Sequence, residues 1–186
     1  IDGASARDFD DAITISRCAN GNFWLGVHIA DVSHYVAEGS ALDHAAYTRS
    51  TSVYFPDRAV HMFPAELSTG LCSLKPKVDR LVQSCLMEID GAGDVKRYEI
   101  HDGVICSNER MTYGDVDSIL THKTSDLREK YSGFVGMFEM MQDLFQALRG
   151  RRSVRGSIDF DLPAARFELD ETGGVMAIVP EERTLA

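Results

Sequence analysis

The amino-acid sequence contains no run of eighteen or more apolar residues, so it predicts no membrane-spanning helix. It does not open on a basic segment followed by an apolar one, which argues against a signal peptide. It shows no Ser/His/Asp or Cys/His arrangement and no phosphate-binding glycine loop, so it does not support those forms of catalysis or a P-loop site. Internal repeats and low-complexity stretches are also absent. The 186 residues suffice for one domain with a hydrophobic core.

Cysteine is scarce, and its spacing does not form a CxxC pair. The four cysteines are Cys18, Cys72, Cys85 and Cys106, and the last three stand in apolar surroundings ("GLCSL", "QSCLM", "VICSN"). This pattern favours small buried thiols over the alternatives of a zinc site or a disulfide. Free thiols fit a reducing compartment, so we expect a cytoplasmic protein without a membrane partner.

Positive charge is in deficit, because 19 basic residues face 29 acidic ones and the net charge is −10. Taken over the whole chain, this argues against binding nucleic acid. A metal-dependent nuclease is nevertheless locally acidic where it holds cations. Basic residues cluster in "RGRRSVRG" at Arg149, Arg151, Arg152 and Arg155. That cluster is either a solvated turn after a helix or a contact surface.

The first half of the sequence predicts a β-hairpin and a short helix. Apolar and polar residues alternate on both sides of Asn20-Gly21 within residues 11–32, and Asn-Gly is the strongest short hairpin signal. The stretch "SALDHAAYTR" predicts a helix, with Ser40 as its N-cap. Residues 50–70 contain two prolines and no sustained period, so they are expected to be mostly loop.

The second half predicts more strands, a longer helix and a final hairpin. Residues 79–116 indicate two or three strands, with a turn at "DGAGD". Residues 125–149 follow a helical period, and residues 157–180 predict a hairpin with a loop at "DETGG". The predicted fold is therefore α+β, with a mostly antiparallel or mixed sheet and flanking helices. The helical period is formed by apolar side chains expected to pack in the core: Phe134, Met137, Phe138, Met141, Leu144, Phe145 and Leu148.

The six histidines are scattered along the chain. His28 stands in a strand pattern, where a packed or hydrogen-bonded side chain is expected. A metal site formed by His28, Asp31 and His34 is an alternative.

The opening stretch "IDGASARDFDDA" concentrates four aspartates, Asp2, Asp8, Asp10 and Asp11. Neighbouring carboxylates raise one another's pKa unless a cation intervenes. Oxygen ligands of this kind suit Mg²⁺, Mn²⁺ or Ca²⁺, and four carboxylates can hold the two ions used in phosphodiester cleavage. The alternatives are a solvated acidic turn, a lone structural ion, or an aspartyl phosphotransferase, although "GASAR" is not the apolar strand that a phosphotransferase motif normally follows.

Several longer motifs occur in one order along the chain: "IDGASARDFDDA", "HIADVSHYV", "TSVYFPDRAVHMFPAELSTGLCSL", "DRL" and "RMTYGDV". Together they closely resemble the catalytic RNB domain of the ribonuclease II / ribonuclease R family. The resemblance is dense from residue 1 to about residue 120 and returns in "GSIDFDLPAARFELD". It implies an RNB-like fold and a 3′→5′ exoribonuclease that uses Mg²⁺, with Mn²⁺ as a substitute, and releases nucleoside 5′-monophosphates. Its expected partners are single-stranded RNA and other RNA-decay proteins.

The resemblance also assigns roles to individual residues. Asp2, Asp8, Asp10 and Asp11 match the family's active-site aspartates, which bind Mg²⁺ and position the attacking water. Tyr113 matches the tyrosine that holds the 3′-terminal nucleotide. Tyr54 and Phe160 match the two aromatic residues that clamp the terminal bases. Aromatic stacking suits an enzyme that degrades any sequence, because every base has a π-face.

The chain also departs from the family. The family's arginine-bearing segment that contacts the scissile phosphate is missing, as are its flanking RNA-binding β-barrels. Residues 1–186 are therefore expected to be the N-terminal portion of an RNB catalytic domain. The alternative function is a catalytically incompetent fragment that acts as an RNA- or protein-interaction module. The oligomeric state is left open.

Overall fold

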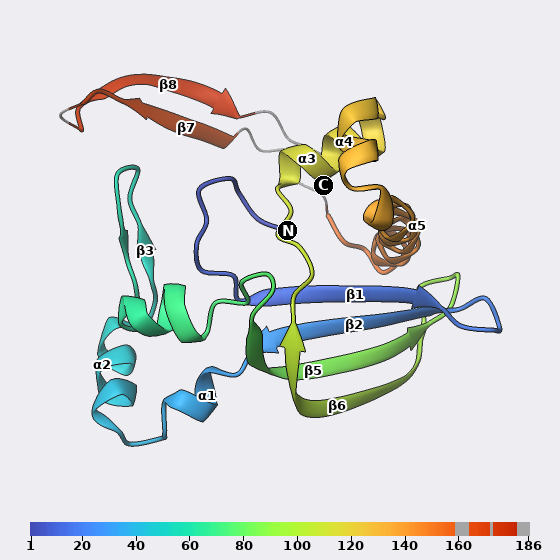
Figure 1. Ribbon diagram of the computed structural model, residues 1–186, viewed down its shortest axis with the longest axis horizontal. Helices are drawn as coiled ribbons and strands as arrows, with labels where there is room; N and C mark the ends of the chain where they lie inside the picture. The colour runs from blue at the N-terminus through green and yellow to red at the C-terminus, as the bar shows by residue number, and fades with distance from the viewer. Residues whose placement is uncertain (159–163, 172, 182–186) are drawn as a thin grey trace.

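A computed structural model describes residues 1–158, 164–171 and 173–181 (Figure 1). Its central element is a four-stranded antiparallel sheet in the order β1-β2-β5-β6. The predicted α+β fold with an antiparallel sheet and flanking helices is confirmed. The strands of this sheet are β1 (Asp11–Arg17), β2 (Phe23–Ala30), β5 (Asp79–Ile89) and β6 (Val95–Cys106).

Strands β1 and β2 form the hairpin predicted at Asn20-Gly21. Gly21 has a φ of 84°, a conformation that glycine adopts without steric cost. Strand β1 begins at Asp11, so the sheet starts where the aspartate-rich stretch ends. The pairing of Asp11 with Ile29 places that stretch at one end of the sheet.

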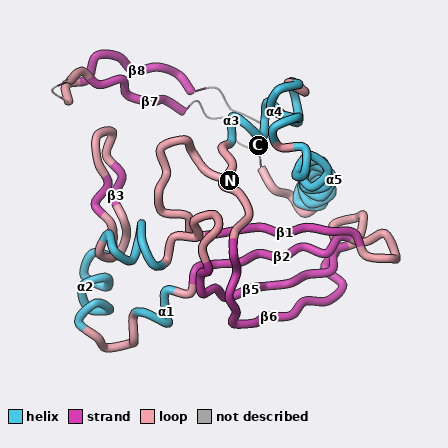
Figure 2. Tube along the Cα trace, viewed as in Figure 1, coloured by secondary structure: helices cyan, strands magenta, loops and turns pink. Residues whose placement is uncertain are grey.

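Strands β5 and β6 form the second predicted hairpin. The Asp90 carboxylate accepts hydrogen bonds from the amides of Ala92 (3.0 Å) and Asp94 (2.9 Å), which closes the turn at "DGAGD". Strand β2 pairs with β5, so the two hairpins lie side by side in one sheet. In Figure 2 these four strands are the large magenta group.

Helices lie at both ends of the sheet and across one face. The short helix α1 (Val32–Tyr35) precedes α2 (Ala41–Arg49), and the Ser40 side chain accepts from the Asp43 amide at 3.2 Å, as predicted for an N-cap. After strand β6, the chain continues through four more helices: α3 (Tyr113–Asp117), the π-helix η2 (Ser118–His122), α4 (Ser125–Lys130) and α5 (Ser132–Val154).

The predicted long helix is interrupted at Tyr131, which separates α4 from α5. The apolar side chains of α5 pack as expected: Phe138 and Leu144 are buried, one among the helices and one against the sheet residues Phe23 and Ile89. Phe145 is the exception, being 37% exposed. Helix α5 therefore covers the face of the sheet on which β1 and β2 contribute apolar residues.

Residues 50–70 contain more structure than the sequence predicted. A two-residue pair of strands, β3 (Val53–Tyr54) and β4 (Ala59–Val60), forms a short hairpin. The π-helix η1 (Leu67–Leu71) follows it. Figure 1 shows the β3–β4 hairpin on one side of the N-terminal loop and α3 on the other.

The C-terminal hairpin predicted over residues 157–180 is present as β7 (Ala164–Leu169) and β8 (Val175–Glu181). It forms its own two-stranded sheet. Phe160 lies outside the described residues, so its predicted place beside the bases stays a prediction.

Two smaller expectations need correction. Cys72 is buried as expected, but Cys85 is only half-buried and Cys106, at the end of edge strand β6, is exposed; all four cysteines are free. The arginine cluster does not form a turn after a helix, since most of it lies in the last turns of α5. There Arg151 forms a 2.7 Å ion pair with Asp94.

No helix in the described part of the chain is both long and apolar enough to cross a bilayer.

Candidate active site

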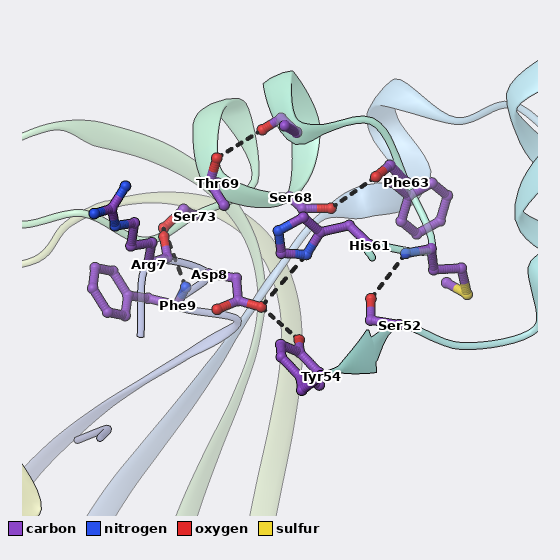
Figure 3. Close-up of polar contacts among 12 residues, drawn as sticks. Arg7, Asp8, Phe9, Ser52, Tyr54, His61, Phe63, Ser68, Thr69 and Ser73 are labelled. Atoms are coloured by element: carbon purple, nitrogen blue, oxygen red, sulfur yellow. Dashed lines mark hydrogen bonds and ion pairs between the residues drawn. The ribbon is translucent and has the colours of Figure 1, made fainter. Parts of the chain in front are cut away.

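The aspartate-rich loop is anchored through its backbone by Ser73, which is fully buried. The Ser73 hydroxyl donates to the carbonyl of Arg7 at 2.9 Å and accepts from the amide of Phe9 at 3.1 Å. The amide of Leu74 donates to the Phe9 carbonyl at 2.8 Å. These bonds hold the chain on both sides of Asp8 (Figure 3).

Ser73 is itself held by Arg80, the arginine of "DRL". The Arg80 guanidinium donates from Nε to the Ser73 carbonyl (2.9 Å) and from its terminal nitrogen to the Gly70 carbonyl (3.2 Å). Arg80 is the second residue of β5, and its bond to Gly70 joins β5 to the end of η1. The loop that carries Asp8 is therefore braced against the sheet.

The Asp8 carboxylate contacts two rings of the β3–β4 hairpin region. The Tyr54 hydroxyl donates to Asp8 Oδ2 at 2.6 Å, and this bond is the main cause that raises the pKa of Tyr54. His61 places its Nδ1 3.9 Å from the same oxygen. Figure 3 shows both rings turned toward the carboxylate. Tyr54 is 64% exposed, so its ring remains accessible despite the bond.

Asp10 carries the clearest electrostatic sign of crowding. Burial raises the pKa of Asp10, and the neighbouring charge of Asp8 raises it further. Asp11 and Asp2 add to this rise, while His61 opposes it. Asp2, Asp8 and Asp11 therefore all lie close enough to Asp10 to act on its carboxyl group.

Asp2 lies beside Tyr113 through backbone pairing. The Asp2 amide donates to the Met111 carbonyl (3.1 Å), and the Tyr113 amide donates to the Asp2 carbonyl (3.2 Å). Tyr113 is the first residue of α3, whose N-cap Thr112 accepts from the Asp115 amide at 3.0 Å. Tyr113 is 45% exposed.

The four aspartates divide between two cavities. Asp8 and Asp10 line one of about 480 Å³, together with Tyr54 and His61. Asp2 and Asp11 line another cavity, of about 420 Å³, which is also lined by apolar side chains of α5. Within residues 1–158, 164–171 and 173–181, no three His, Cys, Asp or Glu side chains are close enough together to form a ready metal site.

The alternative set of His28, Asp31 and His34 has other contacts. His28 is buried, and its ring nitrogens lie 3.0 Å from the Thr14 hydroxyl and 2.8 Å from the Ser84 hydroxyl. Burial also lowers its pKa. Asp31 caps α1 by accepting from the His34 amide at 3.1 Å. The expectation that His28 is packed and hydrogen-bonded is confirmed.

Sequence reasoning missed three residues that shape the site: His61, Ser73 and Arg80. All three stand inside motifs quoted for the family resemblance. The one available signal was that polar residues interrupt apolar stretches there, as in "AVHMF" and "GLCSL". A polar residue in an apolar stretch often serves a buried hydrogen bond, which is the role of Ser73 here.

Comparison with known proteins identifies the family of the chain. The family model described as the RNB domain matches residues 1–186. Ribonuclease R 1 of Lactococcus lactis subsp. lactis is 46% identical over 186 residues, covering 100% of this chain and 23% of the relative. The chain thus spans about a quarter of the length of the curated relatives it matches.

Solved structures give the same result. RNase R of Mycoplasma genitalium in complex with ribose-methylated single-stranded RNA matches with a TM-score of 0.89 and 29% identity, over 98% of this chain and 28% of that one. The same enzyme in complex with double-stranded RNA matches with a TM-score of 0.88 and 29% identity, over 97% of this chain and 32% of that one. The chain belongs to the RNB-domain family of ribonucleases R and II.

Proposed function

We propose that this chain supplies the metal-binding aspartates and base-stacking aromatic residues of a cytoplasmic, Mg²⁺-dependent 3′→5′ exoribonuclease. Its substrate is single-stranded RNA and its products are nucleoside 5′-monophosphates. One observation carries the proposal: the hydroxyl of an exposed tyrosine, Tyr54, is bonded to Asp8 at the cavity that Asp10 also lines. A group that can stack on a base and a group that can hold a cation thus meet at one place.

The relatives support this function. The curated relatives are named ribonuclease R, and the Mycoplasma genitalium enzyme has been solved with single- and double-stranded RNA. Because this chain spans about a quarter of such relatives, their activity is a proposal for it.

The carboxylates fit a divalent cation in charge and in number. Burial raises the pKa of Asp10, and the negative charges of Asp8, Asp11 and Asp2 raise it further, so a cation at this place would be favourable. Mg²⁺ typically takes one or two protein carboxylates and leaves its other positions to water and substrate phosphate. Asp8 and Asp10 meet that requirement in one cavity, and Asp2 and Asp11 would serve a second ion. When bound, the ion would supply positive charge that stabilises the phosphodiester during cleavage.

The chain's own residues would bind and orient the substrate. Tyr54 offers a ring face to a base near Asp8, and Tyr113 offers one near Asp2. Stacking contributes roughly 1–3 kcal/mol per base without reading its identity, and only single strands present free base faces. Asp10 stands between Asp8 and Asp11, so its carboxylate would orient the attacking water beside the ion.

A second candidate function is an RNA-interaction module without catalytic activity. One observation favours it: in the described part of the chain the aspartates lie in two cavities, and no three potential ligands come together. A remnant of this kind would bind RNA through its aromatic residues and would not need a divalent ion.

Degradation of a 5′-labelled single-stranded RNA separates the two. The full-length gene product should shorten the RNA from its 3′ end with Mg²⁺, and Asp10→Asn should lower single-turnover decay by at least about a hundredfold. RNA affinity with the metal chelated should be unchanged or higher, because a negative charge near phosphate is lost. Normal turnover in Asp10→Asn would refute the assignment, and loss of binding together with turnover would indicate a structural role instead.

A further inference from the structure

His61 lines the cavity that holds Asp8 and Asp10, and the sequence analysis assigned it no role. Its side chain is 18% exposed, and Nδ1 lies 3.9 Å from Oδ2 of Asp8. This nitrogen is buried and lacks a hydrogen-bond partner among the described residues. The ring stands edge-on to Tyr54, at a centroid distance of 6.3 Å and an angle of 84°. His61 therefore lies beside both groups that carry the proposed function.

The β3–β4 hairpin positions His61 and Tyr54 together. Tyr54 pairs with Ala59, and His61 follows directly after β4. The Met62 amide donates to the Ser52 hydroxyl at 2.9 Å, which ties the residue after His61 to the residues before Tyr54 (Figure 3). Both rings are thus carried on one closed unit of backbone, on the same side of Asp8.

The surroundings of Nδ1 indicate where its hydrogen lies. A lone pair on Nδ1 would point at a carboxylate oxygen and be repelled, whereas an N–H would be attracted. Oδ2 already accepts from Tyr54 at 2.6 Å and has a second lone pair for another donor. A shift of about 1 Å would bring Nδ1 into ordinary hydrogen-bond distance.

We propose that His61 is a positioning residue: through Nδ1–H it holds the Asp8 carboxylate between its own ring and the Tyr54 hydroxyl. This inference rests on the proposed function, because it assigns His61 to the same site. Both contacts fall on Oδ2, and none of the described residues donates a hydrogen bond to Oδ1. Oδ1 would then be the oxygen left for a cation. The two contacts on Oδ2 would thus orient both the Asp8 carboxylate and the Tyr54 ring.

The asparagine and glutamine variants of His61 test which ring nitrogen acts. The amide of Asn reaches the position of Nδ1, and the amide of Gln reaches that of Nε2. In the full-length gene product, His61→Gln and His61→Ala should weaken Mn²⁺ binding, measured by calorimetry, by about ten- to a hundredfold, the usual effect of losing a group that orients a metal ligand. Turnover should fall by a similar factor with a smaller change in KM. His61→Asn should keep Mn²⁺ affinity and turnover near their wild-type values.

His44 provides the matched control, because it is an exposed histidine on α2. His44→Ala should leave metal affinity, turnover and melting temperature at wild-type values. The proposal would be overturned if His61→Asn and His61→Gln had equal Mn²⁺ affinity and equal turnover, whether reduced or at wild-type values. A metal-affinity loss that follows a lowered melting temperature in all three His61 variants would show a merely structural role.

Failure of the proposed function is a separate result. If the wild-type protein bound Mn²⁺ but degraded no RNA, the exoribonuclease assignment would fail. The metal affinities of the Asn and Gln variants would still decide the role of His61.

Discussion

Replacing Ser73 with alanine should loosen the loop that carries Asp8. The Ser73 hydroxyl is fully buried and bonds to the backbone of both neighbours of Asp8, donating to Arg7 and accepting from Phe9. Alanine keeps the size of the side chain nearly unchanged but removes both bonds. The Arg7 carbonyl and the Phe9 amide then lose their partner at the same time.

The expected loss follows from the burial of these two groups. A buried polar group left without a partner costs about 1–3 kcal/mol. Both bonds are only partly buried, so water would restore part of each loss. We therefore expect Ser73→Ala to lower the free energy of unfolding by about 1–3 kcal/mol in total. Substitutions at exposed sites usually stay within about 0.5 kcal/mol.

Urea unfolding of the chain measures this loss, and amide hydrogen exchange locates it. The Phe9 amide should exchange faster in Ser73→Ala, whereas amides in the middle of β2 should not. Ser16→Ala is the matched control, because Ser16 is an exposed serine on β1. An unchanged free energy of unfolding together with an equally protected Phe9 amide would refute the claim that Ser73 anchors the loop.

Three further predictions concern the aromatic residues and one buried carboxylate. In the full-length gene product, Tyr54→Ala should weaken single-stranded RNA binding by about 1–3 kcal/mol with the metal chelated; wild-type affinity would contradict the stacking role. Tyr113→Ala should change the length of the final products on a labelled RNA, because the terminal nucleotide is held less tightly; identical products would argue against this. Hydrogen bonds from Asn20, and then from Arg97, lower the pKa of Glu88 from 4.5 to about 2. The ionised Glu88 carboxylate therefore stabilises the folded state fully above pH 4.5, and this stabilisation is lost as pH falls through about 2. Acid should accordingly lower the melting temperature less in Glu88→Gln than in wild type. Equal pH profiles of the melting temperature would contradict the assignment.

The regular elements were largely predictable because their signals are local. Asn20-Gly21 specifies its hairpin through a backbone conformation that few other dipeptides adopt, and Ser40 specifies a helix start through a bond to a residue three positions away. The π-helix η1 and the two-residue strands β3 and β4 were missed. Two-residue strands and a five-residue π-helix are too short to show a period in the sequence.

The contacts of the site were not predictable from spacing. Ser73 bonds to residues that lie 64 and 66 positions earlier in the chain, and Tyr54 bonds to Asp8 across 46 positions. The clustering of the aspartates in one short stretch made them candidates, and the family resemblance made the tyrosines candidates. The division of the aspartates between two cavities is visible only in the structure, because it depends on which side of the loop each carboxylate faces.

The order of strands in the sheet also bears on how the chain folds. The pairs β1–β2 and β5–β6 each join neighbouring segments, so both hairpins can form early and on their own. Pairing of β2 with β5 instead closes a loop over residues 31–78, which carries Tyr54, His61 and Ser73. Closing a loop of that length costs conformational entropy before any contact offsets it. We therefore expect joining of the two hairpins to be the slow step of folding, and the same step to assemble the site around Asp8.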